Sequence, residues 1–91
     1  MSSPPETVFL DRDGTINAKA PEGDYVKSWS EFEFLPGARG AIGRLAAAGV
    51  RVIVVTNQRG VALGRMTRDD VEDIHTRLVA ETGEAIAAIY Y

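Results

Sequence analysis

The 91-residue chain contains no cysteine. Disulfides, cysteine-ligated zinc sites and cysteine nucleophiles are therefore excluded within these residues. The chain has no excess of positive charge either, because its formal net charge is −3, and this does not favour nucleic acid or an anionic membrane as a partner. Long apolar runs are also missing, so no segment is long enough to span a bilayer. We therefore expect neither a nucleic-acid partner nor a membrane partner.

The first residues lack the features of a signal peptide. Residues 1–6 read Met-Ser-Ser-Pro-Pro-Glu, without a basic stretch or an apolar one. Since serine and proline cannot form a packed core, we predict a disordered leader over residues 1–6 and a cytoplasmic protein. The remaining residues, 7–91, have an ordinary globular composition with 45% hydrophobic and 25% charged residues over the whole chain. They are predicted to form one small domain or a part of one.

Three short apolar runs predict three β-strands, at residues 7–11, 51–56 and 86–91. The second run contains four consecutive branched or apolar residues, Val52-Ile53-Val54-Val55. Such a run predicts a strand that is buried on both faces, as in a parallel sheet covered by helices.

Two helices are predicted between these strands. Apolar residues spaced by three and four follow Pro36-Gly37 and predict a helix of about a dozen residues. Thr67 is predicted to be the N-cap of a second helix that ends at Gly83, with His75 at its surface or boundary. The order of elements indicates an α/β fold with a Rossmann-like parallel sheet, of which these are the first three strands. Because an outer strand leaves an unpaired edge, the third strand is expected to pair with further sequence or with a partner.

Turn-forming residues separate these elements. Between the first strand and the first helix, Tyr25-Val26 and Phe32-Glu33-Phe34 are predicted to be two short strands of a flap at about 18–34. Residues 57–66 are predicted to be a glycine-containing loop.

Polar residues follow two of the predicted strands. Asp11 and Asp13 end the first strand, and like charges this close repel unless a cation, a ligand or a proton lies between them. Thr56 ends the second strand, and ligands of open α/β sheets bind at the carboxyl ends of the strands. We therefore expect both strand ends to face one crevice, with neutral donors for phosphate oxygens and carboxylates for Mg²⁺. The alternative is an Asx turn after the first strand and a plain polar turn after the second.

At this point a resemblance emerges. The run Asp11-Arg12-Asp13-Gly14-Thr15-Ile16-Asn17, with Val54-Val55-Thr56-Asn57-Gln58, resembles the first two motifs of the haloacid dehalogenase (HAD) superfamily of phosphatases. The finer pattern in Tyr25-Val26, Phe34-Leu35-Pro36-Gly37 and Gln58-Arg59-Gly60-Val61-Ala62 is similar to a small-capped subgroup. That subgroup contains D-glycero-D-manno-heptose 1,7-bisphosphate phosphatase and histidinol phosphatase. The resemblance covers nearly the whole chain and only the N-terminal part of such a phosphatase.

The resemblance implies an activity and a role for particular residues. The implied activity is Mg²⁺-dependent hydrolysis of a small sugar phosphate through an aspartyl-phosphate intermediate. Asp11 is the implied nucleophile and Asp13 the implied general acid and base, and both are implied metal ligands. The implied substrate- and phosphate-binding residues are Gly14, Thr15, Asn17, Thr56, Asn57, Gln58 and Arg59.

The family pattern also includes parts that this chain does not carry. These are a lysine that grips the phosphate, a final acidic residue that completes the Mg²⁺ shell, and in many members a cysteine-rich zinc loop. All three are expected beyond position 91, so we expect the chain to be the N-terminal part of a longer phosphatase. The alternatives are a catalytically incomplete piece or a non-catalytic partner-binding module, a histidinol phosphatase, and a nucleic-acid 3′-phosphatase.

Overall fold

Three parallel strands form one sheet in the order β1-β2-β3. The computed structural model describes residues 6–91, so the predicted leader lies, except for Glu6, outside the described residues. The strands are β1 (Thr7–Leu10), β2 (Arg51–Val55) and β3 (Ile86–Tyr90). All three predicted strands are thus confirmed, and each ends one residue earlier than predicted. The parallel α/β arrangement is confirmed as well.

Two long helices and one short helix connect the strands: α1 (Ala38–Ala47), α2 (Arg59–Ala62) and α3 (Arg68–Glu81). The start of α3 is fixed by a reciprocal cap, because the Thr67 side chain accepts from the Asp70 amide and the Asp70 side chain accepts from the Thr67 amide. The predicted N-cap is therefore confirmed, whereas α2 was expected to be loop. Among residues 6–91, no helix has the length and apolar character that crossing a membrane requires.

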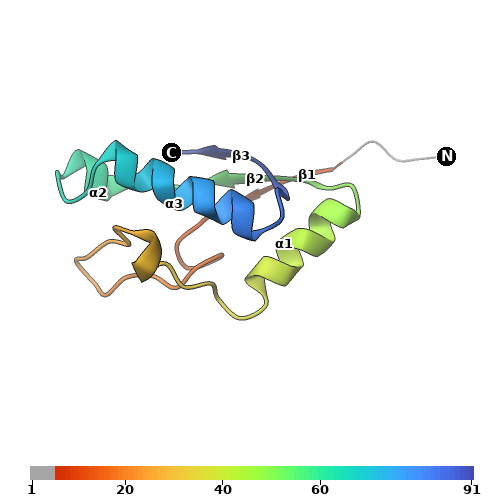
Figure 1. The fold of residues 1–91 in the computed structure, drawn as a ribbon, viewed down its shortest axis with the longest axis horizontal. Coiled ribbons are helices and arrows are strands. Elements are labelled where there is room, and N and C mark those ends of the chain that lie inside the picture. Colours follow the sequence, from red (N-terminus) through yellow and green to blue (C-terminus); the bar gives the residue numbers. More distant parts are fainter. Residues whose placement is uncertain (1–5) are drawn as a thin grey trace.

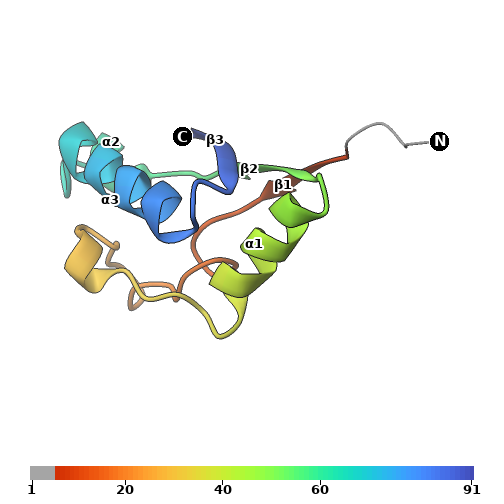
Figure 2. The same cartoon turned by 45° about the vertical axis from the view of Figure 1, so that its right-hand side comes forward.

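Both long helices cover the same face of the sheet (Figures 1 and 2). The core lies between them and the strands, where Ile42 of α1 and Leu78 of α3 pack against Val52 and Val54 of β2. Each of these four side chains is at most 2% exposed. Burial of one such side chain stabilises a fold by about 1.5–3 kcal/mol, so this layer holds the strands and helices together.

The opposite face of the sheet is bare in the described residues. Side chains alternate along a strand, so Val55 points away from the face on which Val52 and Val54 are buried, and it is 47% exposed. Phe9 and Tyr90 share this face by register and are 65% and 60% exposed. The prediction that β2 is buried on both faces is therefore wrong here, because an apolar run signals a need for cover but not that the same chain supplies it.

The segment 18–34 packs beneath the start of α3 rather than forming a hairpin. Neither predicted flap strand is present; a short 3₁₀ helix, η1 (Trp29–Glu31), takes their place, and Phe34 makes only a single bridge to Asn17. The rings of Trp29 and Phe32 stack at 4.8 Å, and Val26 joins an apolar cluster with residues of α3. This segment is therefore held by aromatic and apolar packing instead of strand pairing. Its role as a flap stays a prediction.

Candidate active site

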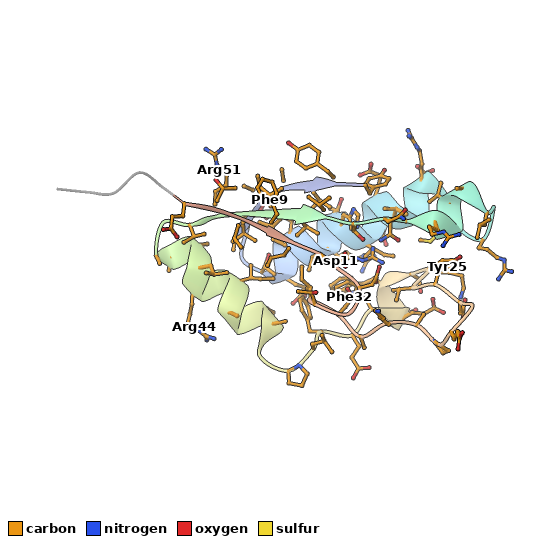
Figure 3. All side chains as sticks on the ribbon, turned by 180° about the vertical axis from the view of Figure 1, so that it is seen from behind. Phe9, Asp11, Tyr25, Phe32, Arg44 and Arg51 are labelled. Carbon is orange, nitrogen blue, oxygen red and sulfur yellow. The ribbon has the colours of Figure 1, made fainter. Side chains whose placement is uncertain are left out.

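The two motifs meet at neighbouring strand ends. Asp11 directly follows β1, and Figure 3 shows it beyond the tip of that strand, on the side from which the segment carrying Tyr25 approaches. Thr56 directly follows β2, is 5% exposed and donates its amide to the Tyr90 carbonyl at 2.9 Å. Since β1 and β2 are adjacent and parallel, both motifs lie at the same edge of the sheet.

Gln58 joins the two motifs physically. Its side-chain amide donates to the Thr56 hydroxyl at 2.8 Å and to Asp13 Oδ2 at 3.3 Å. One side chain from the β2 motif therefore contacts both its own strand end and the carboxylate of the β1 motif. The sequence predicted that the two strand ends lie close together, but it did not predict these hydrogen bonds of Gln58.

The loop after β1 turns sharply at Gly14. This residue has a φ of 87°, which side chains other than glycine adopt rarely, and its amide donates to the Asn17 carbonyl at 2.7 Å. Asp11 stays exposed in this loop, and its Oδ1 accepts from the Arg12 amide at 2.8 Å. The turn therefore brings Asn17 back beside Asp13, to which it is joined by a single β-bridge, while Asp11 remains at the strand tip.

Asp13 is held by three side chains. Its Oδ1 accepts from Arg12 at 2.9 and 3.2 Å and from Asn17 at 2.9 Å, while its Oδ2 has longer contacts, at 3.2 Å to Arg12 and 3.3 Å to Gln58. Three donors leave Oδ1 little further accepting capacity, so Oδ2 is the oxygen better able to accept another hydrogen bond. The side chain is 30% exposed and is thus reachable from solvent.

Asn17 lies beneath this carboxylate rather than in the open crevice. It is completely buried, and its amide donates to Asp13 and to the Ala18 carbonyl. Its Oδ1 is buried without a hydrogen-bond partner. Asn17 therefore contacts the Asp13 carboxylate and is not among the residues that line the pocket beside it.

A pocket of about 360 Å³ opens beside Asp13. Four of the predicted site residues line it: Asp13, Asn57, Gln58 and Arg59. Residues Lys19 to Val26 of the segment 18–34 form the facing wall. Asp11, Gly14 and Thr56 are not among its lining residues. Thr15 lies elsewhere, in a separate apolar depression between β1 and α1. The structure thus gathers four of the nine predicted residues around the pocket, and the other five, Asp11, Gly14, Thr15, Asn17 and Thr56, are not part of its lining.

The two walls of the pocket touch at Gly60, the second residue of α2. Gly60 is buried, and a Cβ atom there would lie 2.9 Å from the Met66 sulfur and 3.1 Å from Cγ of Tyr25. Only glycine lets α2 approach the segment 18–34 this closely. The pocket therefore has a tight seam on the side where the β2 loop meets Tyr25.

Two residues at the site were missed by sequence reasoning, Arg12 and His75. His75 was expected at the surface or boundary of α3, yet it is 5% exposed. Burial, and after it the positive charge of Arg12, lowers the pKa of His75 to about 4, so the ring is neutral near pH 7. The signal was present in the sequence, because His75 falls on the same helical face as Val71 and Leu78.

The chain supplies only part of a metal site. Among the described residues, no group of three or more histidine, cysteine, aspartate or glutamate side chains is placed to hold an ion. Asp11 offers an exposed carboxylate whose second oxygen can still coordinate, and hard cations such as Mg²⁺ prefer oxygen ligands. The donor chemistry therefore fits Mg²⁺, with the Asp13 carboxylate already engaged by its three donors.

The chain is similar in sequence to known phosphatases. No family model matches the chain. It is 51% identical over 71 residues to the D-glycero-alpha-D-manno-heptose-1,7-bisphosphate 7-phosphatase of Mycobacterium tuberculosis, covering 78% of this chain and 37% of the relative. It is 42% identical over 89 residues to the D-glycero-D-manno-heptose-1,7-bisphosphate 7-phosphatase of Chlorobaculum tepidum, covering 94% of this chain and 44% of the relative. The chain is a homologue of HAD-family phosphatases.

Solved structures of this phosphatase group share the fold. The D,D-heptose 1,7-bisphosphate phosphatase of B. bronchiseptica, complexed with magnesium and phosphate, matches with a TM-score of 0.86 and 33% identity over 93% of this chain and 48% of its own. The corresponding enzyme of Burkholderia thailandensis matches with a TM-score of 0.69 and 34% identity over 94% of this chain and 52% of its own. The chain thus spans about half, or less, of the length of these HAD relatives.

Proposed function

We propose that this chain forms the nucleophile-bearing part of a Mg²⁺-dependent phosphomonoesterase that acts on a heptose 1,7-bisphosphate or a similar small sugar phosphate. The observation that carries the proposal is the contact of Gln58 with both Asp13 and Thr56, because it brings both motifs to one strand edge. The names of the relatives support the phosphorylated-sugar substrate class.

In the proposed reaction, a carboxylate oxygen of Asp11 attacks phosphorus and forms an aspartyl-phosphate as the bond to the sugar oxygen breaks. Asp13 gives that leaving oxygen a proton, carried on Oδ2, and then takes a proton from the water that hydrolyses the intermediate. Thr56 and Asn57 hold phosphate oxygens at the end of β2, which is the positioning and charge-stabilising role that phosphoryl transfer requires.

Charge neutralisation comes from two sources in this proposal. When bound, Mg²⁺ would reduce the repulsion between the phosphate and the Asp11 carboxylate and would polarise the phosphoryl group. Asp11 would hold it together with the Asp13 main-chain carbonyl. On the protein side, Lys19 and Arg59 line the pocket and supply positive charge for the rest of a phosphorylated substrate.

The test is phosphate release by the full-length protein that contains this segment. We expect turnover of heptose 1,7-bisphosphate with Mg²⁺ and loss of turnover after chelation with EDTA, restored by added Mg²⁺. Histidinol phosphate and a 3′-phosphorylated oligonucleotide serve as competing substrates. Faster turnover of either would reassign the substrate, and no turnover of any phosphomonoester would overturn the proposal.

A second candidate is favoured by the bare face of the sheet. Phe9, Val55 and Tyr90 form an exposed apolar face that suits a non-catalytic module which docks onto another polypeptide. This candidate predicts no Mg²⁺-dependent turnover by purified residues 1–91, together with self-association or partner binding through this face. Turnover by that segment alone would exclude it.

A further inference from the structure

Arg12 has no task in the proposed reaction, yet it is the most buried charged side chain of the first motif. It stands between the two carboxylates and is 1% exposed. A guanidinium cannot lose its proton in a protein, so a buried one must be paired and hydrogen-bonded to be tolerated.

The guanidinium is held on three sides. Its Nε and Nη2 donate to Asp13 in a forked arrangement, at 3.2 and 2.9 Å to Oδ1 and 3.2 Å to Oδ2. Its Nη1 lies 3.1 Å from Nε2 of His75, which reaches it from α3, and its Cζ lies 6.0 Å from the centre of the Phe32 ring. The plane of the fork is therefore fixed by groups from three different segments.

The histidine has one possible role in this contact. Arginine only donates, so Nε2 of His75 accepts and the ring proton is on Nδ1. Its ring also meets Tyr91 edge-on at a centroid distance of 5.4 Å, which limits its rotation. His75 is thus an acceptor fixed on a helix that shares no other hydrogen bond with the first motif in the described residues.

We propose that His75 and Arg12 are positioning residues that aim the Asp13 carboxylate at the leaving oxygen, with His75 acting through Arg12. The inference rests on the proposed function. A carboxylate on a loop rotates about two bonds, and a forked guanidinium stops both rotations only while its own plane is fixed. His75 fixes that plane at Nη1, the nitrogen that Asp13 does not use. The geometry therefore connects helix α3 to the acid and base of the reaction.

The first experiment compares two variants of His75 in the full-length protein. His75→Leu removes the acceptor, and we expect kcat to fall about 10- to 100-fold with KM changed less than about twofold, the size seen when supporting residues of a site are lost. His75→Gln keeps an acceptor oxygen at a similar reach, and we expect it to recover most of the lost kcat. Ile74→Val, at a buried neighbour on the same helix whose side chain cannot hydrogen-bond to Arg12, is the matched control and should keep kcat within about twofold.

The second experiment tests whether His75 acts through Arg12. Arg12→Lys keeps the charge but loses the fork, and we expect a similar fall in kcat. In the Arg12→Lys protein, His75→Leu should then lower kcat by less than about twofold, because the two substitutions remove one device. Additive losses would overturn the proposal, as would an unchanged kcat in Arg12→Lys.

The outcomes separate this inference from the proposed function. No phosphate release by the wild-type protein would remove the proposed function itself. A wild-type protein that is active, with His75→Leu unaffected, with His75→Gln as slow as His75→Leu, or with only KM raised, would overturn the positioning role alone. Where His75→Leu does not fold, Arg12→Lys and His75→Gln still decide the question.

Discussion

Asp11 and Asp13 lie two positions apart, yet their surroundings differ sharply. Asp11 is exposed, and its side chain accepts one hydrogen bond, from the Arg12 amide. Asp13 accepts from three side chains, two of which are fully or almost fully buried. The comparison teaches that residues 6–91 complete the surroundings of one carboxylate and leave those of the other open. This fits a nucleophile that needs free lone pairs and an acid and base that needs a fixed direction.

The largest expected effect comes from removing the open carboxylate. Asp11→Asn keeps the shape but deletes the attacking oxygen, so we expect kcat of the full-length protein to fall by about 10⁴-fold or more. Phosphate release and covalent labelling of the protein by phosphate should both disappear. Asp69→Asn, an exposed substitution in the first turn of α3, is the control and should stay near wild type. Retained labelling in Asp11→Asn would show that Asp11 is not the nucleophile.

Removing the held carboxylate is expected to have a smaller and different effect. Asp13→Asn should lower kcat by about 10²- to 10⁴-fold, the range of general acid–base catalysis. With p-nitrophenyl phosphate, whose leaving group needs no proton, we expect the phosphorylated protein to accumulate, because only its hydrolysis is slowed. Equal loss of labelling in Asp11→Asn and Asp13→Asn would mean that the two carboxylates do not have separate roles.

The hydrogen bond from the buried Asn17 side chain to Asp13 can be removed by substitution. Asn17→Ala removes a buried donor to Asp13 and to the Ala18 carbonyl, so we expect the free energy of unfolding to fall by about 1–3 kcal/mol. Denaturant unfolding of the full-length protein measures this loss. Asn57→Ala, at an exposed position of the second motif, should change stability by less than about 0.5 kcal/mol. A similar loss in both variants would contradict the structural role of Asn17.

Acidification should destabilise the folded protein by protonating His75, the residue that contacts Arg12 behind Asp13. The pKa of His75 is lowered from 6.5 to about 4 in the folded protein, so between these values the unfolded state binds more protons. Stability contributed by the neutral ring is therefore present above pH 6.5 and is lost as pH falls towards 4. Between pH 7 and 4.5 we expect wild type to lose about 2 kcal/mol more stability than His75→Gln, measured by denaturant unfolding. Parallel pH curves would show that His75 is not held neutral.

The sequence predicted the elements whose signals are local. Apolar runs gave the strands, and Thr67 with the residues after it predicted the start of α3, because a side-chain cap depends only on the next turn. The short helix α2 was missed, since Arg59 to Ala62 is too brief for periodicity to register and contains a glycine. The flap strands were wrong because stacking of Trp29 on Phe32 depends on contacts that spacing does not encode.

In the candidate site, too, only the features with local sequence signals were predictable. That Asp11, Asp13 and Thr56 gather at one edge of the sheet follows from parallel strands and was predictable. The Arg12 to His75 contact joins residues far apart in the chain, so no local pattern predicted it. The exposed face of β2 was not predicted for a related reason. The apolar run from Val52 to Val55 indicates that both faces favour burial, but it does not show which segment covers each face.

The glycine seam between α2 and Tyr25 has a consequence for protein engineering. Gly60 is not itself among the lining residues, so a methyl group at position 60 replaces none of the pocket's own side chains. It would instead press on Met66 and on the rigid root of the Tyr25 ring, and so act as a wedge between the two walls. We expect Gly60→Ala to push the segment that carries Tyr25 away from α2 at some loss of stability, which makes this position a way to enlarge the pocket for bulkier phosphorylated compounds without replacing the residues assigned to the chemistry.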